Sequence, residues 1–129
     1  MSTISAYKID EHRRLCLKKD LNEINLWTTM LEDFNTELDH LNIIEKQLIK
    51  NSSVSNVIKA MRRKNILNMA SICKYEQEIK TEYEYGKGEY NEIRLKYHKQ
   101  RQQNYFQFLE EIKLFKNQIY KLLKRYGSK

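Results

Sequence analysis

Histidine, cysteine and carboxylate side chains at helical spacing are the residues of this sequence that could do chemistry. His12, Cys16 and Asp20 are four positions apart in turn, so one helix face would present nitrogen, sulfur and oxygen donors. Glu37 and His40 have the Glu-x-x-His spacing that di-iron helical bundles use. Di-iron bundles need a second copy of that motif, and none occurs. We therefore predict no metal site and no ferritin-like protein.

Catalytic and phosphate-binding signatures are absent from the chain. There is no Gly-x-Gly-x-x-Gly, no Walker loop, no nucleophile elbow and no His-Glu-x-x-His. Catalysis also usually needs a concave pocket, which a narrow helical bundle seldom provides without a cofactor. We therefore predict that the protein is not an enzyme and uses no cofactor.

The composition predicts the elements that must position these side chains. The 129 residues include no proline and three glycines, with 40% hydrophobic and 32% charged residues. A sheet-rich fold would need more turn residues than this. No apolar run approaches the roughly 18 residues of a membrane-spanning helix, so we expect no transmembrane segment. The chain is expected to be all-α and elongated.

Apolar residues recur at alternating steps of three and four, the spacing of helices that pack as a bundle or coiled coil. The first such segment predicts a helix over about 4–50. Flanking residues such as Leu26 and Met30 make its apolar stripe wider than one seam, which indicates more than one partner helix. The seam consists of Ile24, Trp27, Leu31, Phe34, Leu38, Leu41 and Leu48.

Asparagine and serine at positions 51–53 favour a turn. We expect Ser53 or Ser55 to cap a second helix over about 54–85, antiparallel to the first. Its predicted apolar set includes Val54, Ile58, Met61, Ile66, Met69 and Ile79.

The glycine pair Gly86 and Gly88 leaves two topologies open. If the glycines form a turn, a third helix covers about 89–126 and the protein is an elongated antiparallel three-helix bundle in a single domain, 1–129. If a helix tolerates them, the protein is a long two-helix hairpin with a continuous second helix. We favour the glycine turn. The last segment has the clearest pattern, with Tyr105, Phe108, Ile112, Phe115 and Ile119 on one face.

Apolar helix surface in excess of a single seam predicts a helical protein that acts through protein–protein contacts, either self-association or docking to a partner. The biological process is open. The residues expected to contact such a partner are Trp27, Met30, Phe34, Tyr83, Tyr90, Phe108 and Phe115.

The formal charge of +7 supports an alternative, a basic protein associated with nucleic acid. Residues 1–50 hold seven basic against nine acidic side chains, and residues 89–129 hold ten against four. Pairing between an acidic first helix and a basic last helix explains the same asymmetry. The residues that would contact an anion are Arg62, Arg63, Lys64, Lys96, Lys99, Arg101, Lys121, Lys124 and Arg125. Basic residues flanking 115–123 also suggest contact with a membrane surface.

The N-terminal segment lacks the apolar core of a secretory signal, and Cys16 and Cys73 suit a reducing compartment, so we expect a cytoplasmic protein with buried free thiols. The stretch over 53–64, continuing to Tyr75-Glu76-Gln77-Glu78, resembles small uncharacterised helical proteins of Bacteroidetes. That resemblance implies no activity and no site residue. The seam at Leu26-Trp27 is also similar to the first helix of spectrin-type repeats, which supports a three-helix architecture.

Overall fold

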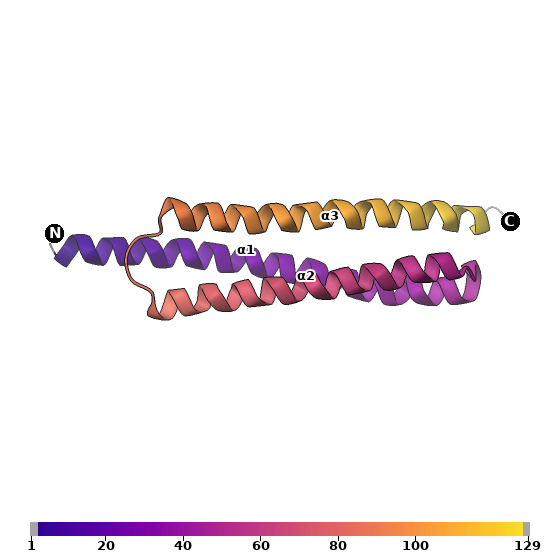
Figure 1. Cartoon of the computed structure of the whole chain (residues 1–129), viewed down its shortest axis with the longest axis horizontal. Helices are drawn as coiled ribbons and strands as arrows, with labels where there is room; N and C mark the ends of the chain where they lie inside the picture. The colour runs from indigo at the N-terminus through magenta and orange to yellow at the C-terminus, as the bar shows by residue number, and fades with distance from the viewer. Residues whose placement is uncertain (1–2, 128–129) are drawn as a thin grey trace.

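Three long helices make up the computed structural model, which describes residues 3–127, with side chains over 6–126. They are α1 (Thr3–Ile44), α2 (Ser52–Tyr85) and α3 (Glu92–Gly127). Figure 1 shows them side by side along one axis, with α2 antiparallel to both α1 and α3. The all-α three-helix bundle predicted from the glycine turn is therefore confirmed, and the two-helix hairpin is wrong. No helix among the described residues is both long and apolar enough to cross a bilayer.

The apolar seams of the three helices meet along the bundle axis. From α1, every predicted seam residue except Leu48 is buried, and all five residues of the α3 face are buried. In α2, Val54, Ile58, Met61 and Ile79 join this core. Ile66 does not, because Asn65 occupies the core position four residues after Met61 and leaves Ile66 exposed.

The first helix is continued by a π-helical turn, η1 (Glu45–Ile49), and ends at Lys50, whose φ is +50°. The wider turn brings Glu45 and Ile49 to the core side and leaves Leu48 exposed, so the prediction of Leu48 as a seam residue was wrong.

Helix α2 begins two residues earlier than expected because Asn51 caps it. The Asn51 side-chain oxygen accepts hydrogen bonds from the backbone N–H groups of Ser53 and Val54, at 2.8 and 3.4 Å. Neither Ser53 nor Ser55 is the cap, which corrects the prediction from the sequence.

The second turn contains both glycines, as predicted. Gly88 has a φ of +95°, a region that side chains with a Cβ rarely adopt. Helix α3 begins at Glu92, three residues later than predicted, because the side chain of Asn91 accepts from the backbone N–H of Arg94 at 3.0 Å. Tyr90 therefore lies in the connection between α2 and α3 and belongs to neither helix.

Glu82 of α2 contacts both of the other helices at this end of the bundle. The buried Arg13 of α1 donates from its guanidinium to the carbonyl oxygen of Glu82 at 2.6 Å, near the C-terminus of α2. The side chain of Glu82 forms an ion pair with Arg94 of α3 at 2.8 Å. The turn and the start of α3 are thus fixed to α1, close to the polar cluster described next.

Candidate functional site

A polar cluster interrupts the apolar core between α1 and α3. Asp20 stands between the core residues Leu17 and Ile24 on α1, and Glu23 lies at the edge of the same face. His98 faces them from the second turn of α3. Asp20 and His98 are 6% and 4% exposed, whereas Glu23 is only partly buried and connects the cluster to solvent.

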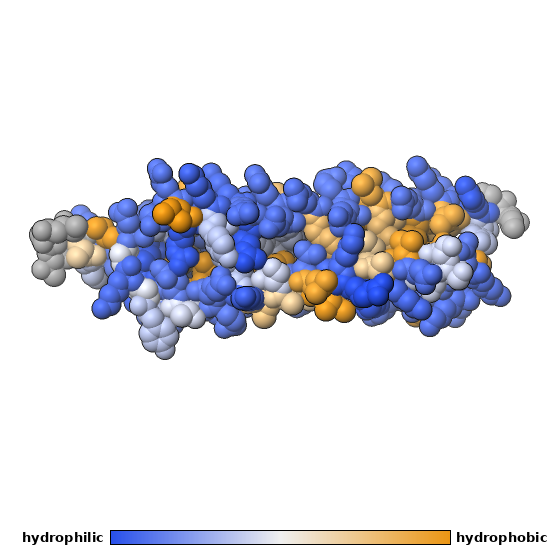
Figure 2. Space-filling model, viewed as in Figure 1, coloured by the Kyte–Doolittle hydropathy of each residue, from blue (hydrophilic) through white to orange (hydrophobic). Residues whose placement is uncertain are grey.

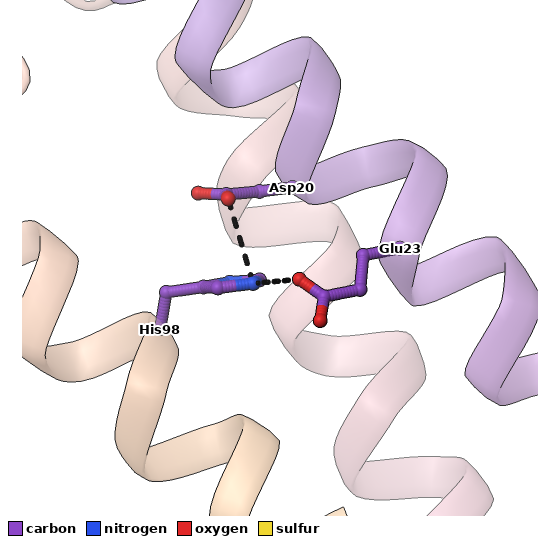
Figure 3. Close-up of side chains that lie close together, drawn as sticks. All are labelled: Asp20, Glu23 and His98. Atoms are coloured by element: carbon purple, nitrogen blue, oxygen red, sulfur yellow. Dashed lines mark hydrogen bonds and ion pairs between the residues drawn. The ribbon is translucent and has the colours of Figure 1, made fainter.

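Figure 3 shows both carboxylates of α1 directed at the same imidazole nitrogen. The Nε2 of His98 lies 2.6 Å from Oε1 of Glu23 and 3.4 Å from Oδ1 of Asp20. Within the described part of the chain, these three residues are the one group of at least three His, Cys, Asp or Glu side chains whose donor atoms converge, all within 4.8 Å of one another.

Each member of the cluster is also held by a neutral polar side chain. The hydroxyl oxygen of Tyr75 lies 2.6 Å from Nδ1 of His98. The Tyr90 hydroxyl donates to Oδ2 of Asp20 at 2.5 Å, and the Gln102 amide donates to Oε2 of Glu23. These contacts come from α2, from the turn and from α3, so the cluster depends on the assembled bundle.

Aromatic rings enclose His98 on the core side. Trp27 stacks on the imidazole with ring centroids 5.5 Å apart, and it stacks on Tyr105 at 5.1 Å. The Tyr75 ring contacts the imidazole at 5.7 Å. Solvent therefore reaches the cluster from the side of Glu23.

This environment raises the pKa of several acidic groups in and around the cluster. Burial raises the pKa of Asp20, although the hydrogen bond from Tyr90 and the neighbouring His98 act in the opposite direction. Burial also raises the pKa of the Tyr75 and Tyr90 hydroxyls, so both keep their protons at neutral pH. The cluster thus contains two acids and no permanently charged base.

The donor patterns recognised in the sequence do not form sites among the described residues. Sγ of Cys16 lies 3.7 Å from His12 at the surface, but the Asp20 carboxylate turns inward, away from this pair and toward His98. The Glu37 carboxylate forms an ion pair with Lys116 at 2.7 Å and accepts a hydrogen bond from the Tyr120 hydroxyl at 2.6 Å, so it is engaged by α3.

Four of the seven residues expected to contact a partner lie in the bundle's own core instead: Trp27, Phe34, Phe108 and Phe115. Their aromatic rings contact one another across α1 and α3, for example Phe34 with Phe108 and Phe115 at 6.5 and 6.1 Å. A partner that leaves the bundle closed cannot contact them. Met30 is exposed, and Tyr83 and Tyr90 are half-buried.

The residues expected to contact an anion are spread over the bundle, and several are engaged within it. Arg62 donates to Asn35 and Asp39, and Lys64 forms an ion pair with Glu111 at 3.6 Å. Arg101 donates to Ser71 and Tyr97 and lies over the Tyr75 ring. The exposed members of this set are Arg63, Lys64, Lys96, Lys99, Lys121, Lys124 and Arg125.

The thiols differ from expectation in one respect. Cys73 is exposed on α2, so the prediction that both free thiols are buried was wrong, while Cys16 is half-buried.

No protein-family model, no curated protein and no solved structure matches this chain. The resemblance to Bacteroidetes proteins stays a prediction, and the functional argument rests on the geometry.

Proposed function

We propose that the protein is a non-enzymatic helical bundle that acts through protein–protein contacts, and that its contact surface is the outer face of α2. The observation that carries the proposal is a second apolar stripe on that helix, on the side away from the core. It consists of Ile66, Leu67, Ala70 and Cys73, all exposed, which we call the outer apolar face.

The outer apolar face has the spacing of a helix-packing surface. Its residues stand at i, i+1, i+4 and i+7, so they lie together on consecutive turns. Ile66 is 53% exposed and Leu67 is 70% exposed. Figure 2 shows apolar atoms gathered near the middle of α2, with hydrophilic surface on both sides along the helix. An apolar cluster with a polar rim is typical of a contact surface.

The charges beside this face favour a second copy of the chain as the partner. Lys59 and Arg63 precede the face along α2 and line a hollow together with Ile66. The exposed Glu78 follows the face along the same helix. Two α2 helices that pair antiparallel about Ala70 would place Arg63 of each copy near Glu78 of the other. The small side chain of Ala70 permits the helices to approach closely at the centre.

This surface is small, so we expect a weak dimer. Stable interfaces bury about 1,200–2,000 Å² in total, and four side chains supply only part of that area. Light scattering over a dilution series should therefore give a mass that rises with concentration. Leu67→Ser should abolish that rise. Leu114→Ser should leave it unchanged, because Leu114 is 63% exposed on another helix and is a matched control.

A cross-link tests the geometry of the dimer. Antiparallel pairing about Ala70 places position 67 opposite Cys73 of the other copy, so Leu67→Cys should form a covalent dimer on mild oxidation. Leu114→Cys should not. A constant monomeric mass at high concentration, with no cross-link from Leu67→Cys, would remove the proposal.

Nucleic-acid association is the alternative function, and the exposed outer face of α3 is the observation that favours it. Lys96, Lys99, Lys121 and Arg125 are exposed along this helix. Binding of this kind weakens steeply with salt because phosphate contacts release counterions. Retention of DNA or RNA in a gel shift at low salt, lost in Lys121→Gln with Arg125→Gln, would support it, and no retention would exclude it.

The cytoplasmic location belongs to the same proposal. Both cysteines are unpaired in the structure, which agrees with a reducing compartment. The space beside Trp27 and Tyr75, next to the polar cluster, has a volume of about 30 Å³, room for one water molecule.

A further inference from the structure

The donor atoms of Asp20, Glu23 and His98 converge on one point between α1 and α3 (Figure 3). We propose that this point binds a divalent transition-metal cation of the Zn²⁺ class, with Oδ1, Oε1 and Nε2 as ligands. The cation would join two helices that are far apart in the sequence, and its binding would stabilise the bundle. The proposal is independent of the contact surface on α2.

One donor spacing already matches a tetrahedral site, and a second would match it after a small movement of Glu23. Zinc binds nitrogen and oxygen at about 2.0–2.1 Å, which places neighbouring tetrahedral ligands about 3.3 Å apart. Nε2 of His98 and Oδ1 of Asp20 already lie 3.4 Å apart. Oε1 of Glu23, at 2.6 Å from Nε2, would have to retreat by about 0.7 Å to admit the ion. Glu23 is the most exposed of the three, so it has the room to do this.

Each proposed ligand is oriented by one further polar group, as ligands of metal sites usually are. Tyr90 holds Oδ2 of Asp20 and Gln102 holds Oε2 of Glu23, which leaves Oδ1 and Oε1 directed at His98. Tyr75 lies at Nδ1 of His98. If Nδ1 carries the ring proton and donates it to the Tyr75 oxygen, Nε2 presents its lone pair to the two carboxylates. A cation between them makes that arrangement favourable.

The two carboxylates of the cluster also favour the binding of a cation. Within the described part of the chain, no lysine or arginine forms an ion pair with Asp20 or Glu23, whereas Asp10, Glu37 and Glu82 each have such a partner. His98 is the basic side chain that lies beside both carboxylates. A divalent ion bound among the three would add positive charge next to two acids that no lysine or arginine of the described chain pairs with.

The donor types select the class of metal. One imidazole nitrogen and two carboxylate oxygens, without sulfur, suit Zn²⁺ and neighbouring divalent ions better than Cu⁺. Ca²⁺ and Mg²⁺ prefer sites built only from oxygen. The fourth position faces the solvent side at Glu23, since Trp27 and Tyr75 close the other side. Water can occupy that position.

Titration of the metal-free full chain tests the proposal. Calorimetry with Zn²⁺ should give one equivalent bound, and Co²⁺ should produce the intense visible absorption of a tetrahedral complex. Co²⁺ should also quench the fluorescence of Trp27, the single tryptophan of the chain, which stacks on the proposed ligand His98. Zn²⁺ should raise the melting temperature, and Mg²⁺ should not.

Variants separate this site from other donors. Asp20→Asn and Glu23→Gln keep the shape of the side chains and should each weaken Zn²⁺ binding at least tenfold, while circular dichroism confirms the fold. Tyr75→Phe removes an outer contact and should weaken it about tenfold. His12→Ala, which removes the surface histidine beside Cys16, should leave binding unchanged.

Three outcomes would overturn the proposal. The folded chain would show no Co²⁺ absorption and no Zn²⁺ heat at millimolar metal, or Asp20→Asn and Glu23→Gln would bind like the original chain, or binding would depend on His12. The mass measurements on Leu67→Ser do not involve this site, so the two proposals fail separately.

Discussion

Asn65 is the one fully buried amide of the α2 core, and half of its hydrogen-bonding capacity is unused. Its side-chain nitrogen donates to the carbonyl oxygen of Leu31 at 3.0 Å, but its Oδ1 has no partner among the described residues. A buried polar atom left unpaired costs about 1–3 kcal/mol. Because its one hydrogen bond to α1 is made at a single backbone carbonyl, we expect Asn65 to contribute to the register of α1 against α2 more than to stability.

We predict that Asn65→Leu raises the free energy of unfolding by about 1 kcal/mol, because it removes the unpaired oxygen and adds apolar contact at similar volume. Asn65→Ala should lower the free energy of unfolding, since it leaves a cavity. Urea denaturation of the three proteins measures both. A less stable Asn65→Leu would show that the amide contributes more than its desolvation costs.

Asp20 makes the stability of the metal-free bundle depend on pH. The groups that face it are Tyr90, His98, Glu23 and Lys19, and the net result is a pKa raised above 3.8, chiefly by burial. An acid with a higher pKa in the folded state binds its proton more tightly there. Its contribution to stability is therefore greatest at low pH and is lost as pH rises from about 4 through the folded-state pKa.

We expect Asp20→Asn to abolish the loss of folding stability that Asp20 causes as pH rises. In the presence of a chelator, the difference in unfolding free energy between the variant and the original chain should grow in favour of the variant as pH rises from 4 toward 7. Thermal melts across that range measure it. A pH-independent difference would mean that the carboxyl is not desolvated in the folded chain.

Asn51 and the glycine turn define where the helices begin and end, and each can be tested by one substitution. The side-chain oxygen of Asn51 accepts hydrogen bonds from two backbone N–H groups at the start of α2. Asn51→Ala should therefore lower the free energy of unfolding by about 1 kcal/mol. Ser53→Ala, two residues further on, should change it little. Equal effects of the two substitutions would contradict the cap.

At the other end of α2, the contact between Arg13 and the Glu82 carbonyl holds the turn. Arg13→Met retains the apolar stem but removes the charged donor, so we expect a loss of about 1.5–3 kcal/mol. Arg14→Met is the matched control, because Arg14 is exposed and its ion pair with Asp10 lies at the surface. Chemical denaturation of both variants gives the comparison.

The sequence predicted these helices well because apolar periodicity is a local signal. The seam from Ile24 to Leu41 and the face from Tyr105 to Ile119 are buried as expected. The π-helical turn was not predicted, although Glu45 at a seam position was a visible irregularity. The cluster around His98 was missed because Glu23 is 75 residues away. An aspartate at position 20, between Leu17 and Ile24, was the local sign of a buried polar partner.

The bundle as a body is long and narrow, so its shape in solution distinguishes the modes of association. α1 with its π-helical turn covers 3–49, about 70 Å at 1.5 Å per residue. The outer apolar face is near the middle of α2, since Ala70 lies almost midway between Ser52 and Tyr85. Antiparallel pairing about that point overlays the two bundles along the length of α2, about 50 Å, and leaves the N-terminal end of α1 projecting by about 20 Å at each end of the dimer (Figure 1).

We therefore predict that small-angle scattering shows a doubled mass with a maximum dimension that rises only to about 90 Å as concentration increases. The cross-section of the particle should widen, because the second bundle lies alongside the first. Association through the bundle ends, for example at the hollow formed by Ile49, Val54 and Leu122, would lengthen the particle toward about 140 Å. Leu67→Ser should retain the length and lose the widening, because it alters the side of the bundle and not its ends. A particle that lengthens toward about 140 Å on association would contradict pairing through α2 even if a dimer forms.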